Sequence, residues 1–157
     1  IKYVRRFDNL IVSRSLSKIG LAGCRIGYLI ASKKTAKMLY KFRPFYEISS
    51  FSCLVFKQIL KNNKTLIKYI KETQAGKNFL INNFKRLKIE FFPTNTNFIL
   101  VKLSSKKIKE KIIKLFAKKN ILVMGEGKLP KGDKILRITL GPKLYMKKVI
   151  NVFNKYY

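Results

Sequence analysis

The sequence predicts an α/β protein built in two parts. Near the N-terminus, two short apolar runs flank a loop rich in serine and glycine, a pattern typical of buried strands joined by a turn that carries function. Farther along, stretches of helical periodicity alternate with short runs of strand character. With 157 residues, 47% of them hydrophobic, the chain is long enough to bury a core of its own.

The first part is expected to contain a strand, a loop, a second strand and long helices. Residues 10–12 and 26–31 read as buried strands. A helix is expected over residues 32–42, capped by its first serine and ended by Arg43-Pro44. Ser49-Ser50 predicts the start of a longer helix, which the pair Asn62-Asn63 interrupts after residue 61 before helical periodicity resumes.

The second part is expected to combine short strands with amphipathic helices. Strands are predicted at residues 89–92, 97–103, 121–124 and 135–140. Helix faces are predicted from the spacing of three apolar sets: Leu80, Phe84 and Leu87; Ile108, Ile112, Leu115 and Phe116; and Tyr145, Val149, Val152 and Phe153. In the strand over residues 135–140, alternation places Leu136, Ile138 and Leu140 on one face and Arg137 on the other. The change of pattern near residue 88 indicates a domain boundary that a helix crosses.

The charge is strongly positive. Lys and Arg total 36 against 7 acidic residues, which gives a net charge of +29. Such a charge suggests a nucleic-acid-binding module or a protein of anionic membrane surfaces. However, the lysines are spread along the whole chain, and abundant Ile, Asn, Phe and Tyr are the profile expected from an AT-rich genome. No nucleic-acid recognition motif is present, so we expect neither a nucleic-acid nor a membrane partner, and a basic nucleic-acid-binding module stays the alternative from another functional class.

Histidine is absent and cysteine is scarce. Imidazole-bound zinc and histidine-based triads are therefore excluded within this chain, and Cys24 and Cys53 show neither a disulfide framework nor a metal-ligand spacing, so no metal is expected. No signal peptide and no apolar run approaching about 18 residues is visible, which favours the cytoplasm. The chain opens without methionine at Ile1, and we expect it to be the C-terminal piece of a longer protein.

The chemistry is concentrated in the loop between the first two strands. Lys18 lies among the hydroxyls of Ser15 and Ser17, glycines follow, and Arg25 comes seven residues later. A lysine between buried strands is unusual unless it has a function, although a solvated turn in a lysine-rich chain would also produce one. An amine can condense with the aldehyde of pyridoxal 5'-phosphate, while hydroxyls and a guanidinium bind the phosphate. The pattern therefore predicts a site for this cofactor.

The segment over residues 13–28 resembles the lysine motif of the pyridoxal-phosphate (PLP)-dependent aminotransferases of classes I and II, of fold type I. The similarity is greatest to the histidinol-phosphate aminotransferase branch and extends over nearly the whole chain, as the C-terminal portion of a typical member. It implies that residues 1–88 are the end of the large PLP-binding domain with the interdomain helix, and that residues 89–157 are the small α+β C-terminal domain. It also implies that Lys18 binds the cofactor covalently and moves a proton, and that Ser15, Ser17 and Arg25 hold its phosphate.

A second motif concerns the substrate. Residues 136–141, Leu-Arg-Ile-Thr-Leu-Gly, resemble the family's Leu-Arg-Ile-Thr-Val-Gly signature, which implies that Arg137 binds the substrate α-carboxylate. Asn97 stands where the family has an Asn-Phe segment and is expected to be a pocket neighbour. Met124 stands where histidinol-phosphate aminotransferases have an arginine for the substrate phosphate, and a thioether cannot hold a phosphate. Lys128 or Lys131 could substitute for it.

The resemblance implies a homodimeric aminotransferase that moves an amino group between an amino acid or amino phosphate and a 2-oxo acid. In the family, the aspartate partner of the cofactor's pyridine nitrogen and the aromatic that stacks on the ring precede the part that this chain matches. The isolated chain is therefore expected to be inactive. A decarboxylase of a phosphorylated amino acid on the same fold is the alternative, because the choice of the bond that breaks depends on the pose of the substrate.

Overall fold

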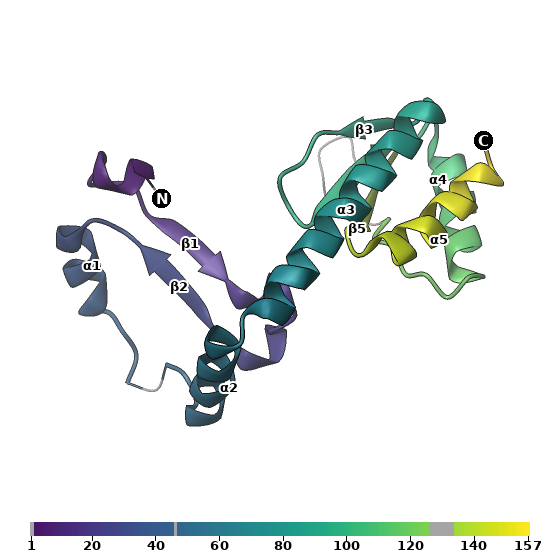
Figure 1. The fold of residues 1–157 in the computed structure, drawn as a ribbon. Coiled ribbons are helices and arrows are strands. Elements are labelled where there is room, and N and C mark those ends of the chain that lie inside the picture. The colour runs from purple at the N-terminus through teal and green to yellow at the C-terminus, as the bar shows by residue number, and fades with distance from the viewer. Residues whose placement is uncertain (1, 46, 126–133) are drawn as a thin grey trace. The chain divides into compact units, whose positions relative to one another are not determined.

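The computed structural model describes residues 2–45, 47–125 and 134–157. The chain divides into two compact units, Ile1–Ile67 and Lys68–Tyr157, and each is described by itself. Figure 1 shows the order of the elements along the chain. The division falls inside the longest helix, and the domain boundary expected near residue 88 stays a prediction.

The first unit contains an antiparallel pair of strands. β1 (Val12–Ser15) pairs with β2 (Gly27–Ile30), with Val12 opposite Ile30 and Ser15 opposite Gly27. The strand predicted at residues 10–12 therefore begins at the end of that range. Both strands were expected to be buried, and this is wrong: six of their eight residues are exposed, and the other two, Val12 and Ile30, are half-buried. The reason is that β1 is mostly polar, and two strands alone have no neighbours to cover their faces.

Three short 3-10 helices and two α-helices complete this unit: η1 (Lys2–Arg5), η2 (Leu16–Ile19), η3 (Ala22–Cys24), α1 (Lys33–Tyr40) and α2 (Ser50–Lys61). The predicted caps are confirmed. Ser32 Oγ accepts the N–H of Thr35 at 3.3 Å, and Ser49 Oγ accepts the N–H of Ser52 at 3.1 Å. Each bond satisfies a backbone donor that has no partner within the helix, so the serines fix where the two helices begin.

The second unit is built on a three-stranded antiparallel sheet in the order β3-β4-β5. The strands are β3 (Glu90–Phe92), β4 (Phe98–Lys102) and β5 (Ile135–Thr139). The C-terminal part of α3 (Lys64–Arg86), α4 (Lys106–Ala117) and α5 (Lys143–Asn154) supply the helices. In Figure 1, the teal end of α3 and the yellow α5 belong to this unit together with the green α4.

One hydrophobic core joins these helices to one face of the sheet. Leu80 and Phe84 of α3 are fully buried, as the helical spacing predicts. Their partners include Ile99 and Val101 of β4, Leu136 and Ile138 of β5, Ile112 and Phe116 of α4, and Phe153 of α5. The Phe153 ring meets those of Phe84 and Phe116 edge-on, with centroids 5.2 and 5.7 Å apart. Such edge-to-face packing stabilises aromatic cores beyond the area that they bury.

The strand predicted at residues 121–124 does not form. Among the described residues of this segment, only Met124 pairs with the sheet, through a single bridge to Arg137. The cause lies at the end of α4, where Asn120 adopts a left-handed conformation (φ 54°) and the N–H of Ile121 donates to Phe116 O at 3.0 Å. Because this C-terminal capping motif uses Ile121, the chain reaches the sheet only at Met124.

The apolar face of α5 differs from the predicted one at its first member. Val149, Val152 and Phe153 are buried as expected, but Tyr145 is 56% exposed. Met146 and Ile150, each 3% exposed, complete the buried stripe instead. The stripe follows positions 146, 149, 150 and 153, so Tyr145 lies beside it, about 100° around the helix from Met146.

Candidate active site

The predicted cofactor residues lie on the connection between β1 and β2. Leu16 and Ile26, both nearly buried, anchor the two ends of this connection, and the Leu16 N–H donates to Ile26 O at 3.1 Å. η2 and η3 lie between these anchors and contact each other. Lys18 lies in η2 and is exposed. The connection is therefore fixed by its apolar ends and presents its polar side chains outward.

The two serine hydroxyls are close together at the start of this connection. Ser15 caps η2, its Oγ accepting the N–H of Ser17 at 3.2 Å, and the two Oγ atoms are 2.6 Å apart. Only one hydroxyl can donate in that hydrogen bond. The other hydroxyl proton remains available to a ligand, and an anion is the ligand that accepts it best.

Backbone geometry sets the place of Arg25. This residue follows η3 with a φ of 53°. Such a left-handed backbone conformation is uncommon for residues other than Gly, Asn and Asp. Strained positions of this kind concentrate at functional sites. Gly27 lies two residues later, where an added Cβ would approach the Arg14 carbonyl oxygen to 3.0 Å. Glycine here allows β1 and β2 to come together at the base of the loop.

Neither Lys18 nor Arg25 forms a salt bridge with any residue that the structure describes. Their positive charges are therefore available to a ligand. One amine, two hydroxyls and one guanidinium on a single connection form a donor set that fits an aldehyde cofactor bearing a phosphate.

The predicted substrate residue Arg137 lies in the second unit, on β5. Its guanidinium carbon is 4.1 Å from the centroid of the Phe98 ring, and its Nη1 is 3.8 Å from the sulfur of Met124. The Nε atom is buried and has no hydrogen-bond partner among the described residues. A buried donor without a partner costs free energy, and a bound carboxylate would satisfy it.

Asn97 lies immediately before β4. Its backbone carbonyl accepts the N–H of Leu140 at 2.8 Å and extends the pairing of β4 with β5 by one bond. This gives Asn97 a structural role through its backbone, while the predicted role as a pocket neighbour stays a prediction. Lys128 and Lys131 lie outside the described residues.

Two residues of this region were not predicted from the sequence: Phe98, which contacts Arg137, and Lys109, which bonds to Gly125 beside Met124. The contact with Phe98 depends on the register of β4 against β5, which alternation alone does not define. Lys109, by contrast, leaves a signal in the sequence, since it precedes Ile112 by three residues and Phe116 by seven and so interrupts an apolar stripe.

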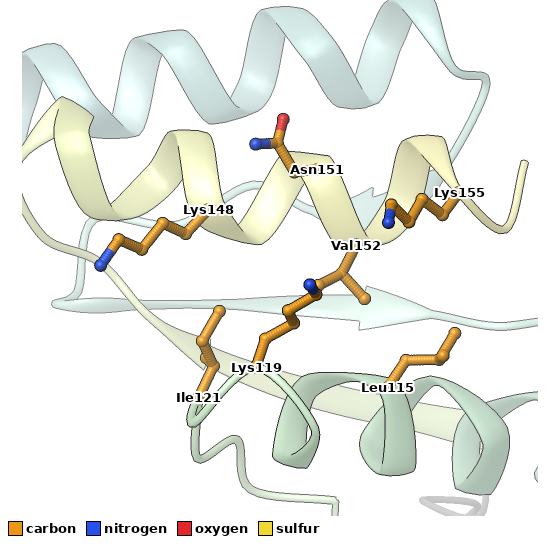
Figure 2. A pocket seen from close by; sticks show the side chains of 7 residues that line it. All are labelled: Leu115, Lys119, Ile121, Lys148, Asn151, Val152 and Lys155. Carbon is orange, nitrogen blue, oxygen red and sulfur yellow. The ribbon is translucent and has the colours of Figure 1, made fainter.

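A pocket of about 410 Å³ lies elsewhere in the second unit, between the end of α4 and α5. Figure 2 shows its lining, which contains none of the predicted site residues: Leu115, Lys119, Ile121, Lys148, Asn151, Val152 and Lys155. Lys155 directly follows the C-terminal end of α5 and Lys119 lies two residues after that of α4, where cations offset the negative end of the helix dipole. Their position is thus explained by helix capping.

Residues 2–45, 47–125 and 134–157 contain neither a cluster of metal-binding side chains nor a helix able to span a membrane. No group of three or more His, Cys, Asp or Glu side chains there could hold a metal ion. No helix in those residues combines the length and the apolar character needed to cross a bilayer.

The family model described as aminotransferase class I and II matches residues 2–153. The chain belongs to this family. A histidinol-phosphate aminotransferase from Vesicomyosocius okutanii is 28% identical over 155 residues, which are 98% of this chain and 43% of that relative. The chain spans about two-fifths of the length of several curated relatives that it matches. The predicted family is thereby confirmed.

Solved structures show the same fold. The histidinol-phosphate aminotransferase from Sinorhizobium meliloti, in complex with pyridoxal-5'-phosphate, superimposes with a TM-score of 0.74 at 22% identity, over 96% of this chain and 42% of that chain. L-threonine-O-3-phosphate decarboxylase from Porphyromonas gingivalis superimposes with a TM-score of 0.71 at 20% identity, over 99% of this chain and 49% of that chain. The predicted class, α/β as the C-terminal part of a fold-type I aminotransferase, is confirmed.

Proposed function

We propose that this chain carries the cofactor lysine and the substrate arginine of a PLP-dependent aminotransferase. The reaction moves an amino group between an amino acid or amino phosphate and a 2-oxo acid. The observation that carries the proposal is the connection between β1 and β2, which carries Lys18, Arg25 and the hydrogen-bonded pair Ser15 and Ser17. Family membership and the histidinol-phosphate aminotransferases among its relatives support it.

Lys18 is the attachment point of the cofactor. When bound, pyridoxal phosphate supplies an electron sink that stabilises negative charge at the substrate Cα. The Nζ atom of Lys18 would accept the proton of the substrate Cα as a general base and then donate it as a general acid. The exposure of Lys18 and its lack of a salt bridge with the described residues are compatible with both roles.

Ser15, Ser17 and Arg25 hold the cofactor phosphate. The hydroxyl pair has one proton left to donate, because the other is used in the 2.6 Å bond between the two oxygens. Arg25 adds a positive charge and a planar fork that matches two phosphate oxygens. Together these residues orient the cofactor relative to Lys18 without themselves taking part in proton transfer.

Arg137 binds the substrate carboxylate. The Phe98 ring supports one face of the guanidinium, so less side-chain freedom is lost when a carboxylate binds. Fixing the carboxylate fixes the bonds around Cα, which decides which bond breaks. Asn97 is proposed as a neighbour of this site. Homodimer formation and a cytoplasmic location remain predictions from the resemblance and the sequence.

Borohydride reduction tests the proposal in the full-length protein, meaning this chain within a polypeptide of its relatives' length. Peptide mapping should find the reduced cofactor on Lys18, and Lys18→Ala should abolish the adduct and the activity. Lys34→Ala, at an exposed position of α1, is the matched control and should change neither. An adduct on any other lysine would show that the cofactor residue is misassigned.

Product analysis with the same protein separates the two candidate reactions. A 2-oxo acid formed from the amino donor supports transamination. Release of carbon dioxide from a phosphorylated amino acid, without a 2-oxo acid, would instead identify a decarboxylase on this fold.

A further inference from the structure

We propose that Lys109 is a positioning residue for Arg137. The inference rests on the proposed role of Arg137 in binding the substrate carboxylate. Lys109 lies on α4 and is only 7% exposed, which makes it the one charged side chain classed as buried among the described residues. In a chain with 36 basic residues, this burial sets it apart. A lysine is rarely buried so completely unless its ammonium has a defined partner.

The ammonium of Lys109 holds the segment that follows α4. Its Nζ donates to the carbonyl oxygen of Gly125 at 2.9 Å. Gly125 also packs closely against the same helix, since an added Cβ would lie 2.1 Å from Cδ1 of Ile113. The charge-assisted hydrogen bond and the absence of a side chain on Gly125 therefore act together to keep this part of the backbone against α4.

The held segment is bonded directly to Arg137. Met124, the residue before Gly125, donates its N–H to Arg137 O at 3.2 Å and accepts the Arg137 N–H at 2.9 Å. Its sulfur accepts from Nη1 of the same arginine at 3.8 Å. The backbone and the guanidinium of Arg137 are thus both in contact with Met124.

This linkage matters because nothing else in the segment pairs with the sheet. Among described residues 121–125, Met124 alone forms a bridge, and a single bridge does not have the cooperative support of a strand. Loss of the Lys109 hydrogen bond would leave the bridge without its anchor to α4. Arg137 would then sample more orientations. Because binding would have to order its side chain, the affinity for the carboxylate would fall.

Hydrogen exchange on the 157-residue chain tests the linkage without any cofactor. Lys109→Met keeps most of the apolar stem and removes the ammonium. We expect at least about tenfold faster exchange at the amides of Met124 and Arg137, while the amides of Ile99 and Val101 in the β4–β5 ladder are unchanged. Lys107→Met, an exposed substitution on the same helix, is the control and should leave all four amides unchanged.

Kinetics of the full-length protein test the consequence for the site. In Lys109→Met we expect KM for the amino donor to rise about tenfold, with the cofactor dissociation constant unchanged and kcat at saturation largely retained. Lys109→Arg should restore most of the loss, because it supplies a charged donor at the same place. Lys107→Met should behave as the wild type.

The outcomes separate this inference from the proposed function. Unchanged exchange at Met124 and Arg137, or an unchanged KM, would overturn the positioning role. Equal acceleration of exchange across α4 and β4, without rescue by arginine, would show that Lys109 only stabilises the fold. If the wild-type protein transaminates no donor, the proposed function fails, while the exchange result still decides whether Lys109 orders the segment next to Arg137.

Discussion

The guanidinium of Arg137 lies over the ring of Phe98, with 4.1 Å between its central carbon and the ring centroid. In the antiparallel register of β4 and β5, Phe98 is opposite Thr139, so its contact with Arg137 is the diagonal one on the same face. The contact limits the orientations of the Arg137 guanidinium before any ligand binds. A diagonal cation–π pair thus connects sheet register with the carboxylate binding proposed for Arg137.

Replacing this arginine by lysine should separate substrate recognition from cofactor binding. Arg137→Lys keeps the charge but loses the two parallel donors, so KM for the amino acid should rise about tenfold or more while cofactor affinity stays the same. Steady-state kinetics and a cofactor titration of the full-length protein measure the two effects. Arg86→Lys, at the exposed end of α3, is the control. Equal damage to both affinities would mean that Arg137 is structural.

The ring beneath Arg137 should also contribute measurably. Phe98→Leu keeps an apolar side chain but removes the aromatic face, and a cation–π contact is worth about 0.5–1 kcal/mol at a partly exposed site. We therefore expect KM for the amino donor to rise about two- to fivefold, with a smaller effect than that of Arg137→Lys. A KM identical to that of the wild type would show that the ring does not prepare the arginine for binding.

Arg25 should act on cofactor affinity and not on turnover. Arg25→Ala removes one charged contact to the phosphate, which should weaken binding of pyridoxal phosphate by about 2–4 kcal/mol while kcat of the saturated enzyme changes little. Fluorescence titration of the full-length protein with the cofactor measures this. Arg6→Ala removes an exposed arginine outside the loop and should bind the cofactor normally. An unchanged dissociation constant in Arg25→Ala would remove this residue from the phosphate site.

Gly76 in α3 should be intolerant of a side chain. An added Cβ would lie 2.0 Å from the Gly141 carbonyl oxygen and 3.0 Å from the Lys143 nitrogen, both backbone atoms. Replacing glycine by alanine normally stabilises a helix by about 0.5–1 kcal/mol. In Gly76→Ala, overpacking should instead lower the free energy of unfolding by about 1–3 kcal/mol. Denaturant unfolding of Gly76→Ala measures this change. Gly23→Ala is the control, because no atom lies within 4 Å of a Cβ added there. Equal stability of the two variants would contradict the close approach of α3 to Gly141.

Two adjacent residues of α5 should differ sharply in their effect on stability. Met146 is 3% exposed and Tyr145 is 56% exposed. Met146→Ala should therefore cost about 2–5 kcal/mol through loss of buried contacts and a residual cavity, whereas Tyr145→Ala should change the free energy of unfolding by less than about 1 kcal/mol. Thermal and denaturant unfolding measure both. The reverse order would mean that the helix presents the face predicted from its sequence alone.

Local sequence signals predicted the structure correctly where the deciding interactions join residues close together in the chain. The serine caps of α1 and α2 and the alternation of β5 are of this kind, and the structure agrees with each of them. The segment over residues 121–124 shows where local signals fail. Its apolar residues favour a strand, but the capping bond from Ile121 to Phe116 at the end of α4 takes precedence.

The sequence by itself determined the family, the order of helices and strands apart from residues 121–124, and the lysine motif around Lys18, because these depend on residue types at fixed short spacings. The tertiary structure decided that Phe98 supports Arg137 and that Lys109 anchors Gly125. It also decided that Met146, and not Tyr145, faces the core. Such contacts join residues far apart in the chain or select one side of a helix. Strand register and helix rotation set them, and both are fixed only when the whole core packs together.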